Sequence, residues 1–582
     1  MLSCPPMNWL DWSILILFFA FTLWDGIRVS GKTQSVEGLL LANRSMPWWA
    51  IGISVMATQA SAISFIATTG YAYMHDMSFL QIYLGLPIAM VILCVTLVPF
   101  FHKAKIFTAY EVLEQRFGLK VRLTTSLLFL LSRGLAMGTV IAAPAYVLAL
   151  ILNIPLFATI LLTGITVTIY TFFGGITGVI RTDIKQLSIM VAGLIFCFFY
   201  IIHQLPEKVG FTDSLYLAGT LNKLNILDFE FDLSEKYTIW SGLIAGVFLF
   251  LSYFGSDQTQ VQRYLTAKSL GHARGSLILS AFAKIPMMFF MLLIGVMIYV
   301  FFVFRPAPLL FIPESNDEII TRSVNQEEFS MALAEREKMA HQFLEDRSNG
   351  ANRAALIESD NLCNFYREQQ IFSLKRQDGE VRNDTNYVLP YFVLNELPNG
   401  IIGLIIAAIF AAAFSSMDSG LNSLAASTTI DWYRRLKKGD GSDKHYLRFT
   451  QWSTAFWGVF ATIGALLIGE TKSLVELVNM IGSYFYGSIL GVFIILFIKR
   501  VNSFGALVGL ITGIISVLVF DSIFHNPDTG NVVLFMPELV QTAFHAQGPT
   551  GYVKSISYLW LNPIGTAVVI VVSILTSFNS KS

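Results

Sequence analysis

Apolar windows recur along most of the chain at the length that a lipid bilayer requires. A helix needs about 20 predominantly apolar residues to cross the hydrocarbon core. By this criterion about thirteen windows of the 582 residues are expected to form transmembrane helices. They lie near residues 10–28, 47–72, 79–101, 122–150, 155–174, 184–204, 238–258, 276–303, 397–418, 447–469, 474–499, 503–523 and 557–577. The pattern predicts an all-α integral membrane protein.

Two of these windows carry polar residues in their middle. The first interruption runs from Ala57 to Ser64 (ATQASAIS) and the second from Tyr253 to Gln258 (YFGSDQ), five expected spans apart. In carriers built from inverted repeats, the first helix of each half is broken near the bilayer midplane, and the freed carbonyls and half-helix ends bind ion and substrate. The two interruptions therefore favour a secondary transporter.

One long polar segment, residues 304–396, separates apolar windows in the second half of the chain. Within it, the spacing of apolar positions from Asn325 to Asp346 predicts an amphipathic helix. The segment contains no nucleophile or metal motif. We interpret it as an extracellular loop subdomain whose partner is unknown.

Basic residues are concentrated in alternate short loops. They follow the first, third, fifth, seventh, ninth and eleventh windows and are Arg28, Lys32 and Arg44; Lys103, Lys105, Arg116 and Lys120; Arg181 and Lys185; Arg263, Lys268 and Arg274; Arg434, Arg435, Lys437, Lys438 and Lys444; and Lys499 and Arg500. The short loops between them hold little more than Lys472 and Lys554. Because cytoplasmic loops carry an excess of Lys and Arg, the N-terminus is expected outside and the C-terminus in the cytoplasm.

The composition narrows the class of protein. Only 13% of the residues are charged and the net charge is zero, whereas soluble domains carry roughly 25% charged residues. We expect no nucleic-acid partner, since no excess of positive charge is present. The glycine motif from Gly174 to Gly178 (GGITG) follows no strand, so we interpret it as a turn at a helix end. No nucleophile, metal or cofactor motif is found, and an enzyme is not expected.

Five stretches carry longer motifs. They are Ala57 to Ala62 (ATQASA), Tyr110 to Phe117 (YEVLEQRF), Gly174 to Asp183 (GGITGVIRTD), Tyr253 to Leu265 (YFGSDQTQVQRYL) and Ala411 to Ser419 (AAAFSSMDS). Together they resemble the sodium/solute symporter family, which includes sodium-coupled sugar, proline, iodide, vitamin and sialic acid carriers. The QRYL and AAAFSSMDS stretches are far more specific than a lone glycine motif.

The resemblance implies a division of the chain into repeats. Two inverted five-helix repeats are expected at residues 47–204 and 238–499, the second interrupted by the insert at 304–396. Residues 1–46, with an extracellular N-terminus and a first helix, precede them, and accessory C-terminal helices within 503–582 follow.

The resemblance also implies a sodium site. In this fold the oxygens that bind sodium come from the broken first helix of repeat one and from the third helix of repeat two. On this chain they are the carbonyls of Ala57, Ala60 and Ala412 and the hydroxyls of Ser415 and Ser416. Small residues such as these serines also ease close packing of helices, but the matching motif in the first broken helix favours the ion site.

Two acids raise the question of a second ion. A carboxylate at membrane depth is costly and is normally paired or functional. Asp183 is either the N-cap of the span that follows it or, as its position in the family motif implies, a neighbour of the sodium site. With Asp418 and Ser419 it can supply a second sodium site, or Asp418 can make the site sensitive to protons.

Substrate recognition is expected beside the broken helices. The resemblance places seven residues in the lining, namely Ser61, Ser64, Gln81, Phe250, Tyr253, Lys284 and Asn479. Tyr253 matches an aromatic residue that closes the site in the sodium/galactose relative, and Lys284 matches a sugar-binding lysine. Phe250 and Ser64 depart from the sugar pattern, so a simple hexose is not favoured.

Arg133 is the other charge within a span, and such a residue is a functional candidate by default. Sialic acid carriers use an arginine of this helix, about one turn further on, to bind the substrate carboxylate. An arginine at this position can equally pair with a carbonyl or a buried acid as a structural strut. If Arg133 and Lys284 both face the cavity, an anionic solute or sugar acid is favoured.

These observations predict sodium-coupled symport of a small organic solute across the cytoplasmic membrane by alternating access. The solute is expected to be a sugar, a sugar acid or another organic anion. The expected partners are this solute, sodium and the lipid bilayer. Two alternatives are open: a proton-coupled or uncoupled carrier of the same fold, and a sensor or interaction protein on a transporter scaffold.

Overall fold

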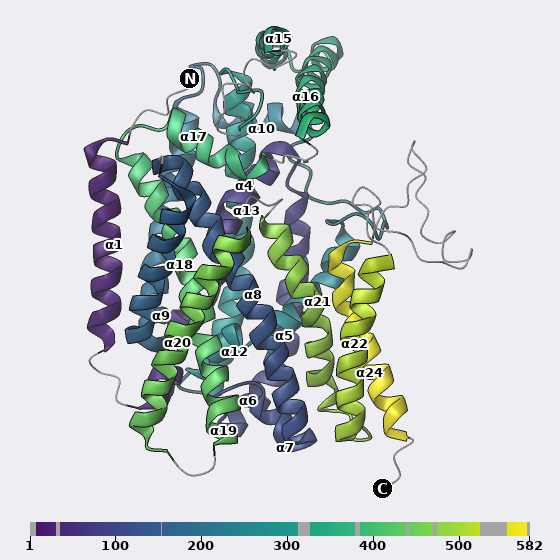
Figure 1. Cartoon of the computed structure of the whole chain (residues 1–582). Helices are drawn as coiled ribbons and strands as arrows, with labels where there is room; N and C mark the ends of the chain where they lie inside the picture. The colour runs from purple at the N-terminus through teal and green to yellow at the C-terminus, as the bar shows by residue number, and fades with distance from the viewer. Residues whose placement is uncertain are drawn as a thin grey trace.

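The computed structural model describes residues 7–30, 35–152, 154–311, 326–378, 384–437, 441–468, 474–523 and 556–578. This part of the chain is helical, and one isolated bridge pairs Met46 with Ala267. The helices stand side by side in one bundle (Figure 1). The all-α fold predicted from the sequence is confirmed.

Among the described residues, eight helices are long and apolar enough to cross a bilayer, and one bent pair would make nine. The eight contain α1 (Trp9–Ser30), α5 (Gly85–Val95) with its neighbours η2 (Ser78–Leu84) and α6 (Leu97–Ala104), α8 (Leu119–Leu152), α9 (Leu156–His203), α13 (Leu270–Val303), α18 (Ile401–Ser427), α22 (Ser503–Ile523) and α24 (Leu561–Phe578). Two shorter apolar helices lie at Ser241–Gly255 and Ile481–Ile495. The total of about thirteen spans and the inverted repeats stay predictions.

Other described elements complete the bundle and its connections. They are α2 (Val36–Leu41), η1 (Ala42–Arg44), α7 (Glu111–Phe117), α10 (Phe211–Thr220), η3 (Ser241–Ala245), η4 (Thr385–Tyr387), α17 (Val388–Glu396), η5 (Thr428–Tyr433), α19 (Arg434–Leu436), α20 (Asp443–Ile468), α21 (Leu474–Ile495) and η7 (Tyr558–Trp560).

Helix α9 contains a sharp break at Gly175. The helix has 48 residues, which corresponds to a length of about 70 Å and is more than twice the thickness of a hydrocarbon core. Gly175 has φ 53° and ψ −164°, a conformation open essentially to glycine alone. The glycine motif is therefore a turn at a helix end, as predicted, and it separates the expected windows 155–174 and 184–204.

Both interruptions predicted from the polar residues are breaks between helices. The first separates α3 (Trp48–Gln59) from α4 (Ala62–Met74), and the two half-helices meet at a bend of 57°. The second separates α11 (Gly246–Gly255) from α12 (Gln258–Leu265). The interrupted apolar pattern thus correctly located both breaks.

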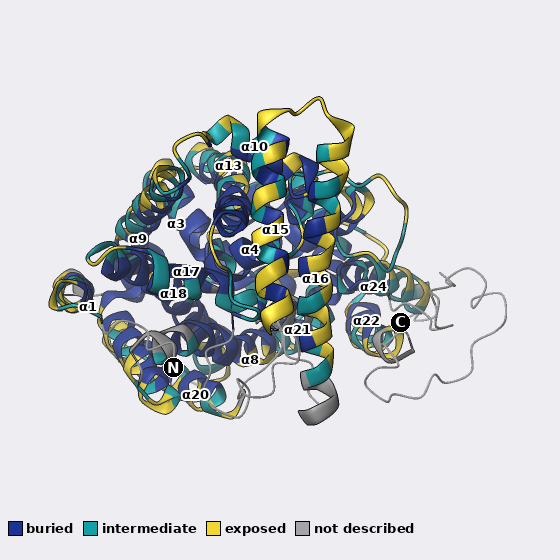
Figure 2. Cartoon of the chain, turned by 90° about the horizontal axis from the view of Figure 1, so that it is seen from above, coloured by how far each residue is buried: buried dark blue, intermediate teal, exposed yellow. Residues whose placement is uncertain are grey.

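The insert forms two helices, α15 (Gln326–Glu345) and α16 (Gly350–Asp378), at one end of the bundle (Figure 1). Seen from above, they lie side by side across that end, with many exposed residues (Figure 2). Helix α15 confirms the amphipathic helix predicted around Asn325 to Asp346. The sequence analysis did not predict α16, although its Ala, Arg, Glu and Gln residues favour a helix.

Buried ion pairs hold the insert together and fasten it to the bundle. Arg336 of α15 pairs with Asp360 of α16 at 3.1 Å and donates to the carbonyl of Phe302, in α13, at 2.9 Å. Arg367 of α16 pairs with Asp384, which is buried just after the insert helices. The insert is therefore packed onto the ends of the bundle helices.

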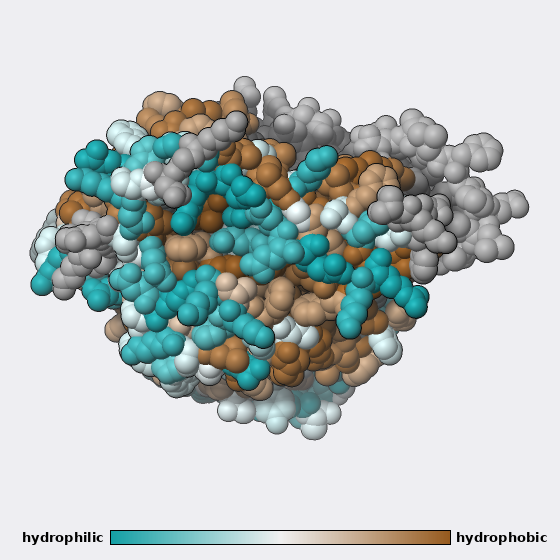
Figure 3. All heavy atoms as spheres, turned by 90° about the horizontal axis from the view of Figure 1, so that it is seen from below, coloured by the Kyte–Doolittle hydropathy of each residue, from teal (hydrophilic) through white to brown (hydrophobic). Residues whose placement is uncertain are grey.

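Helix α1 begins at the end of the bundle that carries the insert, and α24 ends at the opposite end (Figure 1). The end opposite the insert carries α6, α7 and α19, and hydrophilic side chains gather on its face (Figure 3). Exposed basic residues on and beside these three helices include Lys103, Lys105, Arg116, Arg434 and Arg435. Some of the basic residues that the sequence analysis assigned to the cytoplasmic side thus lie together at the end of the bundle opposite the insert.

Candidate functional site

The first break is held open by two serine hydroxyls. Ser61 is the N-cap of α4, and its hydroxyl accepts from the backbone N–H of Ser64 at 3.2 Å. The Ser64 hydroxyl donates to the carbonyl of Gln59 at 3.3 Å. Serine is a preferred N-cap because its side chain satisfies an N–H that the helix leaves unpaired. Both serines, predicted to bind substrate, therefore also shape the break.

Helix α18 lies against this break. Ser416 donates to the carbonyl of Thr58 at 3.0 Å and is 3.4 Å from the carbonyl of Ala412 in its own helix. The three alanines whose carbonyls were predicted as sodium ligands, Ala57, Ala60 and Ala412, are fully buried. In carriers with broken helices, backbone carbonyls of the unwound segment coordinate the coupling ion. The fold brings α3 and α18 together where the sequence analysis placed the ion.

Asp183 is fully buried within α9 and is surrounded by donors from three other helices. Ser54 of α3 donates to it at 2.5 Å, Ser415 of α18 also donates to it, and Arg263 of α12 pairs with it at 3.3 Å. Because Asp183 lies in the interior of α9, the N-cap alternative is wrong. Its carboxylate instead joins three elements beside the first break.

Asp418 lies in α18, close to Asp183, and is also fully buried. Tyr170 donates to Asp418 at 3.0 Å, and Ser419 donates at 3.0 Å. The Ser419 hydroxyl is also 3.2 Å from that of Thr58, one residue beyond Ala57 in α3. No cation pairs with Asp418 among the residues that the structure describes.

Arg263 is a site residue that the sequence analysis missed. It was counted among the basic loop residues after the seventh window, but its side chain is fully buried. It donates to Ser54 at 2.9 Å, to Ser419 and to the carbonyl of Thr259 at 2.6 Å, in addition to its ion pair with Asp183. Its place in the QRYL motif was the one signal in the sequence. Two carboxylates and one guanidinium thus share this buried cluster.

The second break contains an ion pair. Asp257 is the N-cap of α12 and accepts from the backbone N–H of Thr259 at 2.8 Å. Arg133 of α8 pairs with the Asp257 carboxylate, donates to the Tyr486 hydroxyl at 3.1 Å and lies 5.7 Å from the centre of the Tyr253 ring. Of the two interpretations of Arg133, these contacts favour the strut.

Lys284 of α13 differs from Arg133 and Arg263. Its side chain is fully buried, and its ammonium has no hydrogen-bond partner among the described residues. The nitrogen lies 5.8 Å from the centre of the Tyr83 ring, and that ring lies 5.6 Å from the ring of Phe250. Burying an uncompensated charge is costly. Lys284 is therefore the cation with unused capacity to bind an anion.

The other predicted substrate residues lie in different settings. The Gln81 amide donates to the carbonyl of Tyr237 at 2.7 Å and accepts from the N–H of Asp228 at 2.9 Å, so it fastens the segment around residues 228–237. The Tyr253 hydroxyl accepts from Gln260 at 2.9 Å. Asn479 lies on α21, but its side chain is outside the described part of the structure.

A bundle of apolar helices, two of them broken, with oxygens and buried charges gathered at the breaks, defines a membrane carrier. The family model of the sodium:solute symporter family matches residues 39–335 and 362–513. The chain belongs to this family, as the sequence motifs indicated. Its class is that of a sodium-coupled transporter, and family members are transporters rather than enzymes. The gap in the match falls within α15 and α16, so part of the insert is an addition to the shared fold.

Known relatives match this chain over different shares of its length. The sodium/sialic acid symporter SiaT of Proteus mirabilis is 26% identical over 525 residues, covering 88% of this chain and 89% of the relative. The sodium/iodide cotransporter of Homo sapiens is 30% identical over 268 residues, covering 46% of this chain and 41% of the relative. A solved structure of a sodium-coupled sialic acid symporter, substrate-bound and outward-open, superposes with a TM-score of 0.73 at 24% identity over 98% of both chains. That likeness establishes the fold.

Proposed function

We propose that the protein carries a small organic anion, such as a sugar acid, together with sodium across the cytoplasmic membrane by alternating access. The observation that carries the choice of solute is Lys284, a fully buried ammonium without a partner among the described residues. A carboxylate on the solute would compensate this charge through a charge-assisted hydrogen bond. Two relatives that are sialic acid symporters transport solutes of this chemistry.

Sodium binds, in this proposal, between the first break and α18. The hydroxyls of Ser415 and Ser416 and the carbonyls of Ala57, Ala60 and Ala412 supply the oxygens. The hydrogen bond from Ser416 to the carbonyl of Thr58 supports the assignment, because it shows that α18 reaches the end of α3. Sodium bound here would hold the two elements together and so favour one state of the alternating cycle.

The cluster beside this site has an excess of negative charge. Asp183 and Asp418 carry two carboxylates, whereas Arg263 supplies one positive charge and contacts Asp183. A second sodium at Asp183, Asp418 and Ser419, or a proton on Asp418, would balance the cluster. This geometry favours the proton-coupled carrier of the same fold as the second candidate.

The Asp418→Asn variant separates the two ways of balancing the cluster. If a second sodium binds there, the variant lowers the number of sodium ions moved per solute, measured from reversal potentials in proteoliposomes. If a proton binds there, the sodium number is unchanged, and the pH dependence of transport by the wild type is lost in the variant.

Uptake by proteoliposomes tests the choice of solute. The labelled panel contains N-acetylneuraminate, its uncharged methyl ester and galactose, each with and without an inward sodium gradient. We expect sodium-driven uptake of the acid, and we expect Lys284→Gln to weaken it by roughly ten- to a hundredfold, the value of a hydrogen bond to a charged group. Uptake of galactose that exceeds uptake of the acid would contradict the proposal.

The proposed orientation places the insert outside and α19 in the cytoplasm, in accord with the basic residues at the α19 end. Cysteines introduced at Ser348 and Lys437, both exposed, test it in a protein that lacks the native cysteines. An impermeant thiol reagent should label the first from outside and the second only from inside. Labelling of both from the same side would exclude this topology.

A further inference from the structure

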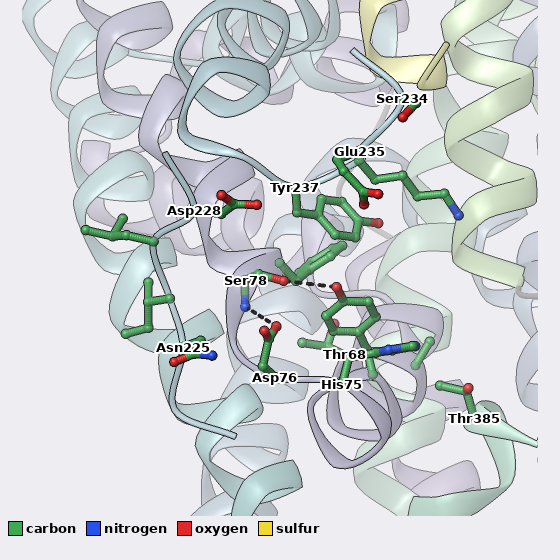
Figure 4. Close-up of a pocket in the computed structure, with 16 residues that line it drawn as sticks. Thr68, His75, Asp76, Ser78, Asn225, Asp228, Ser234, Glu235, Tyr237 and Thr385 are labelled. Carbon is green, nitrogen blue, oxygen red and sulfur yellow. Dashed lines mark hydrogen bonds between the residues drawn. The ribbon is translucent and has the colours of Figure 1, made fainter. Parts of the chain in front are cut away.

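A cavity of about 660 Å³ lies at the C-terminal end of α4, away from the break. Its walls are formed by the end of α4, the beginning of η2, the segment 225–237 and Thr385, which follows the insert helices (Figure 4). A volume of this size is typical of pockets for small organic ligands. Sequence analysis assigned no function to it.

The cavity is separate from the predicted substrate site, but the two lie along the same face of α4. Ser61, Ser64, Thr68 and Tyr71 are three or four residues apart in or at the start of α4, and they therefore share one face of the helix. Tyr71 lies about 10 Å further along the helix axis than Ser64. Thr68 and Tyr71 line the cavity, whereas the substrate residues predicted from the sequence are not among its described lining.

Aromatic side chains make one wall of the cavity. The rings of Phe79 and Tyr237 are 4.9 Å apart, and Tyr71 lies 5.9 Å from the first and 5.4 Å from the second, in each case between ring centres. Packed rings of this kind offer a large, rigid apolar surface with hydroxyl groups at its edge. Such a surface suits the C–H face of a sugar-like ring.

Carboxylates face this wall. Asp76 accepts from the backbone N–H of Ser78 at 2.9 Å, and Asp228 accepts from that of Glu230 at 2.9 Å, so the chain fixes both groups. In each, the second carboxylate oxygen has no hydrogen-bond partner among the residues that the structure describes. In the described lining, these two acids and Glu235 outnumber the basic side chains, which are Lys236 and His75. The cavity therefore favours hydroxyl donors and disfavours a carboxylate.

The hydroxyl of Thr68 provides an independent indication of a ligand. Thr68 is 2% exposed, lines the cavity and has no hydrogen-bond partner for its hydroxyl within the described structure. Buried hydroxyls are normally paired, because an unpaired one costs about 1–3 kcal/mol. A polar group of a ligand in the cavity would satisfy it.

We infer that this cavity is an outer binding site for the uncharged, polyhydroxylated ring of the transported solute. It holds the ring by its aromatic wall and carboxylates before the solute reaches Lys284. This inference rests on the proposed function, because it takes the solute to be one that combines such a ring with an acid group. The excess of carboxylates in the cavity would repel the acid group of the solute, and the ammonium of Lys284 would attract it. The solute would therefore move from the cavity towards Lys284 with its acid group first.

The test uses the methyl ester of N-acetylneuraminate, which has the ring but no charge, and the purified full-length protein in sodium-free potassium chloride. Equilibrium dialysis with labelled ester should show saturable binding. Asp228→Asn should weaken it about tenfold, since the amide keeps the bond to Glu230 but loses the charged acceptor. Thr68→Val should weaken it about fivefold without lowering the melting temperature, because the lost hydroxyl has no partner to leave unpaired.

Matched variants distinguish this site from general effects. Asp232 accepts from the N–H of Ser234 at 2.8 Å in the same segment but does not line the cavity, so Asp232→Asn should bind the ester as the wild type does. Equal losses in Asp228→Asn and Asp232→Asn, or no saturable binding by the wild type, would overturn the inference.

Three further outcomes are informative. Displacement of the ester by tetramethylammonium at concentrations where an equal amount of potassium has no effect would identify an organic-cation site and overturn the inference. Retained ester binding in a protein that shows no sodium-driven uptake would support the outer site while contradicting the proposed function. Sodium-driven uptake without sodium-free ester binding would support the proposed function and overturn the outer site.

Discussion

The two broken helices differ in how charge is balanced around them. At the first break, between α3 and α4, the polar groups of the break itself are serine hydroxyls and backbone carbonyls, and the adjacent cluster has more carboxylates than cations. At the second, between α11 and α12, the capping Asp257 is paired with Arg133. The first region has capacity for a cation, and the second is neutral without one.

The same contrast holds for the buried cations. Arg133 and Arg263 each pair with a carboxylate of the chain, whereas Lys284 has no such partner among the described residues. A buried ion pair fixes helices to one another. A buried charge without a partner is costly, and binding of a ligand of opposite charge would compensate it. The depth of a charged residue in a span therefore does not by itself identify a binding residue. Whether the charge has a partner within the protein distinguishes a structural residue from a binding residue.

The largest effect is expected at the second break. Asp257→Asn keeps a side chain that can cap α12 but removes the partner of Arg133, so a buried guanidinium is left unpaired. Removal of one partner of a buried pair costs about 3–5 kcal/mol. We expect a large fall in the melting temperature of the protein in detergent, with partial recovery in the double variant Arg133→Met with Asp257→Asn. An unchanged melting temperature in Asp257→Asn would show that the pair is not structural.

A smaller effect of the opposite sign is expected at Lys284. Lys284→Met removes a buried ammonium without breaking a hydrogen bond to the described residues, so the free energy of unfolding should rise by about 1–3 kcal/mol. Chemical denaturation in detergent, without solute, measures this change. A loss of stability would mean that the ammonium already has a partner and would remove the contrast with Arg133.

The smallest of the stability effects is expected at the first break. Ser61→Ala removes the hydroxyl that caps α4, which costs about 1 kcal/mol. The same denaturation experiment should therefore show a loss several times smaller than that of Asp257→Asn. Equal losses at the two breaks would contradict the view that only the second depends on an internal charge pair.

The sequence contained enough information to locate the two breaks and to predict the all-α fold, while the alanine and serine ligands for sodium stay a prediction. Helical periodicity and polar interruptions are local signals, and the motifs around Ala57 and Ser415 are specific. Pairing between distant elements is not a local signal. The partner of Arg133 lies 124 positions away along the chain. Arg263 was assigned to a cytoplasmic loop because it follows an apolar window, although its side chain is fully buried.

The outer cavity and α16 escaped prediction for related reasons. The cavity combines residues of α4, of the segment 225–237 and of Thr385, which no pattern along the chain connects. Helix α16 exposes apolar residues such as Leu362, Phe365 and Phe372 beside its polar ones, so it gives a weak periodic signal.

Binding of sodium to the purified protein tests the central claim most directly. Ser416→Ala removes one proposed ligand of the first break and should weaken sodium binding by about tenfold, the value of one lost interaction with a charged group. The matched control is Ser516→Ala in the peripheral helix α22, where the serine donates to the Gly513 carbonyl of its own helix at 2.7 Å, and there the sodium affinity should equal that of the wild type. Wild-type affinity in Ser416→Ala would contradict the claim that sodium binds between the first break and α18.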